Sequence, residues 1–84
     1  MKKPVKKARK LIYDSEGLQL LATKLKEIRA KKGFTQEELS HQSGLTLSQI
    51  ARIETMKVNP TVSTIFRIAR TLHVNVSELF DFKL

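Results

Sequence analysis

One start signal for a helix occurs twice between Gly33 and Glu54, a stretch that reads GFTQEELSHQSGLTLSQIARIE. In each copy an apolar residue precedes a Thr, a Glu or Gln follows the Thr by three places, and a large aliphatic residue comes next. The Thr and the Glu or Gln form a capping box, and the flanking apolar residues form a hydrophobic staple. The two copies are Phe34, Thr35, Glu38, Leu39 and Leu45, Thr46, Gln49, Ile50.

Each copy predicts a short helix, the first over residues 36–43 and the second over residues 47–55. Gly44 stands between them, and glycine readily takes the left-handed conformation that ends a helix. Two short helices joined by a three-residue turn that contains Gly are typical of a helix-turn-helix. The alternative is that both helices only pack into the core of a small bundle.

A longer helix is predicted ahead of this pair, over residues 17–32. Asp14 or Ser15 can cap its start, and Gly33 can end it. Its apolar residues recur at three- and four-residue steps, as expected for a helix that buries one face. They are Leu18, Leu21, Ala22, Leu25 and Ile28.

Two helices are predicted after the pair, which makes the fold class all-α with five helices. The first opens at Pro60 and Thr61, and a capping box at Asn75 and Glu78 starts the second, over residues 76–80. The apolar residues of the first that are expected to face one side are Val62, Ile65, Phe66, Ala69 and Leu72.

The positive charge of the chain is concentrated at its start. The formal net charge is +8, and the first ten positions hold six basic residues and no acidic one, which leaves +2 for residues 11–84. This asymmetry indicates a polyanionic partner, most often nucleic acid, or else a solubilising tail. We expect residues 1–10 to be a disordered basic arm and residues 11–84 to form the domain. Arg67 and Arg70 are expected to be solvated.

The residue content excludes several kinds of site. The 84 residues contain no cysteine, which removes disulfides and thiolate metal sites, and His41 and His73 lack metal-ligand spacing. No nucleophile–base pair, paired carboxylates or phosphate loop can be assembled, so no enzyme, metal or cofactor is expected. The longest apolar run is far below the roughly 18 residues of a membrane span, and the sequence shows no signal-peptide pattern. We therefore expect a soluble, intracellular protein.

The second helix of the pair has a polar outer face. Ile50 and Ile53 can face the core, with Leu45 just ahead of the helix. The residues left on the outer side are Thr46, Leu47, Ser48, Gln49 and Arg52, none of them acidic. A helix whose first residues are short and polar can lie in the major groove of DNA and touch base edges.

The chain from Leu25 to Phe80 resembles the phage-repressor and Cro type helix-turn-helix proteins, often called the XRE family of transcriptional regulators. The resemblance runs through LKEIRAKKGFTQEELSHQSGLTLSQIARIE and NPTVSTIFRIARTLHVNVSELF. It implies a five-helix repressor-like domain that binds double-stranded operator DNA as a homodimer, with residues 47–55 as the recognition helix. It also implies a prokaryotic or phage regulator that acts in the cytoplasm, at the nucleoid.

The resemblance implies base-reading roles for residues of the recognition helix. Thr46, Leu47, Ser48 and Arg52 match positions that reach base edges or the adjoining backbone. Arg52 is the best candidate for direct readout, since its fork can bond guanine O6 and N7 together. Leu47 occupies a position that is more often polar in the family. It cannot donate a hydrogen bond, but it can contact a thymine methyl group.

Other residues match supporting positions of the family. Gln36, Lys57 and Asn59 match positions that contact the DNA backbone, and Gln36 opens a helix whose free N–H groups favour an anion. Arg29 and Glu54 match a structural ion pair between the first helix and the recognition helix.

Met56 departs from the family pattern, because a Gly usually stands there. The recognition helix therefore either ends differently or holds a non-Gly residue in a strained cap.

A second function stays open, in which the main partner is another protein and DNA binding is autoregulatory. An antitoxin-like protein or a restriction-modification controller is of this kind. Leu11, Tyr13, Phe80 and Phe82 lie in the segments that would dock such a partner. The apolar end of the chain, from Phe80 to Leu84, can instead pack within the domain or form a two-fold interface.

Overall fold

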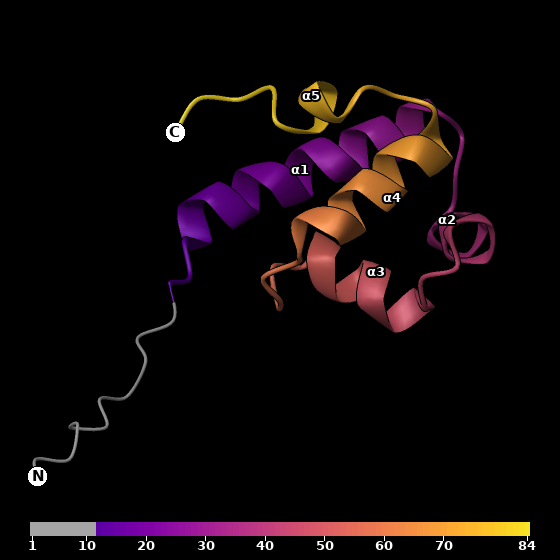
Figure 1. Ribbon diagram of the computed structural model, residues 1–84, viewed down its shortest axis with the longest axis horizontal. Helices are drawn as coiled ribbons and strands as arrows, with labels where there is room; N and C mark the ends of the chain where they lie inside the picture. The colour runs from indigo at the N-terminus through magenta and orange to yellow at the C-terminus, as the bar shows by residue number, and fades with distance from the viewer. Residues whose placement is uncertain (1–11) are drawn as a thin grey trace, which may run out of the picture.

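The computed structural model describes residues 12–84, which fold into five α-helices with no strand among them (Figure 1). The helices are α1 (Ser15–Lys31), α2 (Gln36–Ser43), α3 (Leu47–Glu54), α4 (Val62–Leu72) and α5 (Val76–Leu79). The predicted all-α class with a helix-turn-helix at α2 and α3 is confirmed. Leu11 and the predicted basic arm of residues 1–10 lie outside the described residues.

The two capping boxes predicted at α2 and α3 both form. Thr35 Oγ1 accepts the N–H of Glu38 at 3.0 Å, and the Glu38 carboxylate accepts the N–H of Thr35 at 2.8 Å. Thr46 and Gln49 make the same reciprocal pair at 3.0 and 2.8 Å. Each box satisfies two backbone donors that a helix start would otherwise leave unpaired. The repeated sequence signal therefore sets where α2 and α3 begin.

The other helix starts use related devices. Asp14, and not Ser15, caps α1, because its Oδ1 accepts the N–H of Gly17 at 2.8 Å. At α5 the Glu78 carboxylate accepts the N–H of Asn75 at 3.1 Å, and the N–H of Glu78 bonds the backbone carbonyl of Asn75 at 2.9 Å.

The core draws on every helix. The α3 helix packs against α1 and α2, while α5 packs against α1 and α4. The largest fully buried side chains are Leu25, Leu39, Ile50, Ile68, Leu72 and Leu79. Since burying each such side chain contributes about 1.5–3 kcal/mol, this shared core holds the short α3 and α5 in place.

The buried face of α4 differs from the predicted one. The side chains that α4 buries are Ile65, Ile68, Ala69 and Leu72. Of the five residues predicted to face one side, Val62 and Phe66 are 60% and 42% exposed, whereas Ile68, which was not among them, is buried. Apolar residues on α4 recur at steps of three and four along two overlapping stripes, and spacing alone does not tell which stripe is buried.

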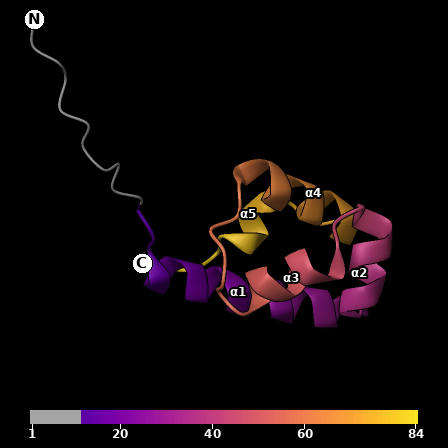
Figure 2. The same ribbon diagram turned by 90° about the horizontal axis from the view of Figure 1, so that it is seen from below.

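The segment after α5 runs back towards the N-terminal end of α1 in both views (Figures 1 and 2). Phe82 packs against the core. The centroid of its ring lies 6.3 Å from the ring centroid of Phe80, which is exposed. Together with Ile12, Leu18 and Leu84 they line an apolar groove of about 290 Å³. Within residues 12–84, no helix is long and apolar enough to cross a membrane.

Candidate nucleic-acid interface

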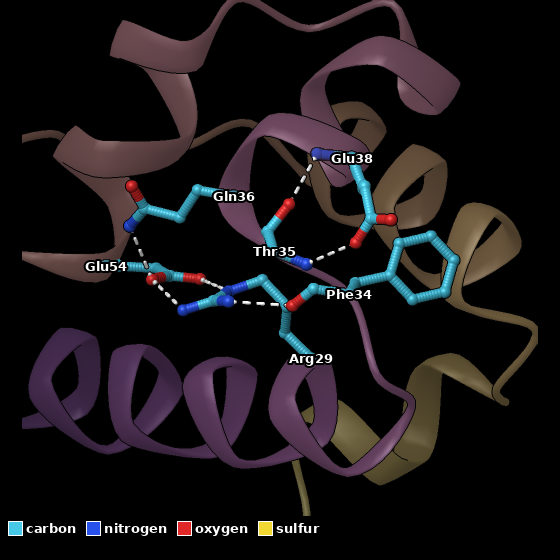
Figure 3. A network of polar contacts seen from close by, with 6 residues as sticks. All are labelled: Arg29, Phe34, Thr35, Gln36, Glu38 and Glu54. Atoms are coloured by element: carbon cyan, nitrogen blue, oxygen red, sulfur yellow. Dashed lines mark hydrogen bonds and ion pairs between the residues drawn. The ribbon is translucent and has the colours of Figure 1, made fainter.

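A buried polar network joins α1 to both helices of the helix-turn-helix (Figure 3). Glu54 is 3% exposed, and its carboxylate accepts from Arg29 Nε at 2.6 Å and from Arg29 Nη2 at 3.0 Å. Gln36 Nε2 donates to the same carboxylate at 2.8 Å. Arg29 Nη1 donates to the backbone carbonyl of Phe34 at 2.8 Å. The buried charge of Glu54 is thus paired and hydrogen-bonded, as burial requires.

The network fixes the positions of three of the predicted site residues. Arg29 and Glu54 are brought together, and their pair links α1 to the end of α3. Gln36, predicted to contact a DNA phosphate, spends one side-chain N–H on Glu54. It stands at the first turn of α2, so its backbone N–H remains among the unpaired donors that a helix start presents.

Two serines that the sequence pattern did not single out hold the turn between α2 and α3. Ser40 Oγ donates to the backbone carbonyl of Leu45 at 2.7 Å, and Ser43 Oγ accepts the N–H of Leu45 at 3.1 Å. Gly44 takes a φ of 82°, the left-handed conformation expected of it. The relative orientation of α2 and α3 is therefore fixed by side chains in the last turn of α2 that bond the backbone of Leu45.

Arg67 of α4 makes a third hydrogen bond that holds this turn. Its Nη1 donates to the backbone carbonyl of Ser43 at 3.0 Å, at the C-terminal end of α2. The last carbonyls of a helix lack partners within it, and a guanidinium is a suitable donor. Arg67 is exposed, as predicted for a solvated charge, and it also makes this hydrogen bond because α4 passes beside the end of α2.

The outer face of α3 is open to solvent. Ile50 and Ile53 are 0% and 4% exposed and turn into the core, while Leu47 is 41% exposed. The exposed residues of this face are Thr46, Leu47, Ser48, Gln49 and Arg52. All four predicted base-reading residues are thus accessible to solvent. The oxygen of the Gln49 side chain is used in the capping box.

The α3 helix ends in a left-handed cap at Met56, whose φ is 63°. The N–H of Met56 bonds the carbonyl of Ile53 at 3.2 Å, and the N–H of Lys57 bonds the carbonyl of Arg52 at 2.8 Å. This is the Schellman pattern, in which Gly is the usual left-handed residue. Of the two outcomes expected for Met56, the structure has the strained cap, with the exposed Lys57 directly after it.

Asn59, predicted to contact the DNA backbone, lies in the same loop. Its Nδ2 donates to the backbone carbonyl of Ile12 at 3.1 Å, and the Tyr13 hydroxyl donates to the backbone carbonyl of Met56. The partners are far apart in the sequence, and the helix patterns carry no signal for these two bonds. Asn59 also lines, with Gln49 and Arg52, a groove of about 310 Å³ between α3 and the start of α4.

The fold and the open face of α3 define the class of this protein as a helix-turn-helix DNA-binding protein. The HTH_3 family model, described as Helix-turn-helix, matches residues 25–79, and the chain belongs to this family. An uncharacterized HTH-type transcriptional regulator of Archaeoglobus fulgidus is 37% identical over 62 residues, which are 74% of this chain and 89% of that protein. The resemblance stated from the sequence is therefore confirmed.

Two solved structures have the same fold. The restriction-modification controller protein C.AhdI from Aeromonas hydrophila matches with a TM-score of 0.73 and 33% identity, over 75% of this chain and 96% of that one. The wild-type restriction-modification controller protein C.Esp1396I matches with a TM-score of 0.75 and 32% identity, over 81% and 90%. The chain is thus a DNA-binding transcriptional regulator of the helix-turn-helix class.

Proposed function

We propose that this chain binds a palindromic operator as a homodimer, with α3 of each subunit in the major groove. The observation that carries the proposal is that α3 is amphipathic. The side chains of Ile50 and Ile53 are buried, and the polar side chains of its outer face are exposed. The network at Glu54 holds this helix rigidly on α1. In a two-fold dimer the two copies of α3 would lie about 34 Å apart, one turn of DNA.

Base readout is assigned to four exposed residues at α3. Arg52 would bond a guanine through O6 and N7, and Thr46 and Ser48 are short enough to reach base edges. Leu47, exposed at the first turn, would contact a thymine methyl group. On this account, sequence specificity comes from the guanidinium of Arg52 and the apolar side chain of Leu47. The hydroxyls of Thr46 and Ser48 contribute further contacts to base edges.

Backbone contacts are assigned to residues on both sides of α3. Lys57 is exposed and supplies charge, while Gln36 and Asn59 would donate from the side-chain N–H that Glu54 and Ile12 leave unused. The six basic residues within positions 1–10 would add sequence-independent attraction to phosphates. Such contacts fix the register of the domain on the duplex, and α3 then reads the bases. The protein would do this in the cytoplasm, on nucleoid DNA.

The dimer interface is assigned to the apolar end of the chain. Phe80 is 45% exposed and Leu84 is 81% exposed, and both line the groove that Ile12 also lines. A second copy that covers this surface would remove apolar area from water, which a domain with a small core can use for stability.

The proposal is tested by selecting bound duplexes from a random DNA pool with purified protein at about 150 mM salt, where purely electrostatic binding is suppressed. Enrichment of a palindrome with half-sites about one turn apart is the expected result. Binding without enrichment would show that the basic residues alone hold the DNA.

A second candidate function is that of a restriction-modification controller. The likeness to C.AhdI favours it, because that likeness spans 96% of the C.AhdI chain. A protein partner would dock at Tyr13, Phe80 and Phe82, and at Leu11 outside the described residues. The selected operator decides the matter, since a controller would have it upstream of its own gene, beside a restriction enzyme gene.

A further inference from the structure

The chain just before α1 is bound to the loop after α3 by two hydrogen bonds. The Tyr13 hydroxyl donates to the carbonyl of Met56, and Asn59 Nδ2 donates to the carbonyl of Ile12 at 3.1 Å. The partners are 43 and 47 residues apart in the sequence. Together the two bonds attach both ends of the short stretch Met56 to Asn59, in which Lys57 lies, to residues 12–13.

One peptide unit of this loop is held from both sides. The carbonyl of Met56 and the N–H of Lys57 belong to the same planar peptide. That carbonyl accepts from Tyr13, and that N–H donates to the carbonyl of Arg52 at 2.8 Å. Fixing this plane fixes the position of the Lys57 Cα, which leaves only rotation about its N–Cα bond to change the direction in which its side chain leaves the backbone.

The conformation of the α3–α4 loop depends on the hydrogen bonds of Tyr13 and Asn59, because the loop has few backbone–backbone bonds of its own. Within residues 12–84, the backbone–backbone bonds of the loop reach from Met56 and Lys57 back to α3. The next N–H bonded to a backbone carbonyl is that of Ile65 in α4, and the N–H of Thr64 just before it bonds Thr61 Oγ1. Met56 also holds a left-handed conformation, with φ at 63°, which a residue with a Cβ does not favour. The Tyr13 bond thus adds a second restraint to a peptide that is otherwise held by the bond from the Lys57 N–H to Arg52.

We propose that Tyr13 and Asn59 are positioning residues, which orient the α3–α4 loop so that Lys57 meets the DNA backbone. This inference rests on the proposed function, because Lys57 is the phosphate contact that it concerns. Tyr13 itself is 48% exposed, so its hydroxyl adds little to the stability of the core. Its effect lies in preorganisation, since a lysine already aimed at its phosphate loses less freedom on binding.

Four proteins test the inference: wild type, Tyr13→Phe, Lys57→Gln and the double variant. Tyr13→Phe removes one hydroxyl and keeps the ring. Thr71→Val is a matched control, because Thr71 Oγ1 also donates to a backbone carbonyl, that of Arg67 at 2.9 Å, within α4. The dissociation constant is measured on the selected operator and on random duplex between about 50 and 200 mM salt, where phosphate contacts dominate the change.

Tyr13→Phe should weaken operator binding about threefold to tenfold, the size expected for one modest contact. The slope of log K against log salt should fall by up to about 0.9, the value for one phosphate contact. The double variant should bind no more weakly than Lys57→Gln alone, because both changes remove the same contact. The melting temperature of Tyr13→Phe should stay close to that of Thr71→Val, and the enriched sequence should be unchanged.

Unchanged affinity and salt dependence in Tyr13→Phe would overturn the inference. Additive losses in the double variant would overturn it as well, since Tyr13 would then act elsewhere than through Lys57. A wild-type protein with no preference for any duplex would instead contradict the proposed function. In that case the salt slopes on random DNA still decide whether Tyr13 acts through Lys57.

Discussion

Arg29 of α1 and Glu54 of α3 meet in a two-bonded ion pair, with Nε to Oε2 at 2.6 Å and Nη2 to Oε1 at 3.0 Å. The side chains of Arg29 and Glu54 are 17% and 2% exposed. The α3 helix has eight residues, too few to be stable alone in water, so its place depends on tertiary contacts. The pair joins the end of α3 directly to the longest helix of the domain.

Arg29→Ala should lower the free energy of unfolding by about 3 kcal/mol, because it leaves the buried carboxylate of Glu54 without its charged partner. Urea denaturation followed by circular dichroism measures the change. Lys26→Ala is the control, since Lys26 is an exposed basic residue of the same helix. Equal midpoints for the two variants would show that the pair contributes nothing beyond a surface charge.

His73→Gly should raise the free energy of unfolding by about 0.5–1 kcal/mol. His73 ends α4 in the left-handed region, at φ 59° and ψ 44°, where Gly carries no Cβ penalty. Arg70→Gly, in the last turn of the same helix, should lower it by about 1 kcal/mol, because Gly is a poor residue inside a helix. Thermal unfolding of both variants should therefore show shifts of opposite sign. Destabilisation by both would contradict the claim that His73 is strained.

Deleting residues 2–10 should weaken binding to operator and random DNA alike. The deletion removes six basic residues, so the slope of log K against log salt should fall by up to about 5. The operator preference should remain, because α3 is intact. Titrations at several salt concentrations measure both effects. A truncated protein that keeps the wild-type slope would show that these residues are only a solubilising tail.

Phe80→Ser should weaken dimerisation, whereas Phe66→Ser should leave it unchanged. The two residues make a matched pair, since Phe80 is 45% exposed and Phe66 is 42% exposed, on different parts of the surface. Sedimentation equilibrium across a range of protein concentrations gives the dissociation constant of each dimer. The opposite order of effects would move the interface to the exposed face of α4.

Local patterns predicted the elements of this fold, and the reason is visible at Thr35 and Thr46. Each capping box is made within four residues, so it can be read from sequence spacing without knowledge of the fold. The end of α3 was harder to predict, since Met56 takes the conformation that Gly usually takes. Local chemistry alone did not decide between a strained cap and a different ending.

The same sequence patterns did not predict the hydrogen bonds between segments that are far apart in the sequence. The bond from Arg67 to the end of α2 and the bond from Tyr13 to Met56 depend on which segments lie side by side, and no periodicity encodes that. The choice between the two apolar stripes of α4 was also made by the neighbouring helices. The pairing of Arg29 with Glu54 was expected only because the chain resembles a family.

The central claim, that α3 reads base edges through Arg52, is tested most directly by repeating the duplex selection with Arg52→Ala and with Arg70→Ala. Both variants remove one exposed arginine, but Arg52 lies on α3 and Arg70 on α4. Arg52→Ala should lose the preference at one base pair in each half-site, a discrimination of about 1–3 kcal/mol, and keep the rest of the palindrome. Arg70→Ala should enrich the wild-type sequence. If Arg52→Ala enriched the full wild-type palindrome, base reading by Arg52 would be contradicted. If it lost operator and random DNA equally, the assignment of α3 as the recognition helix would be contradicted.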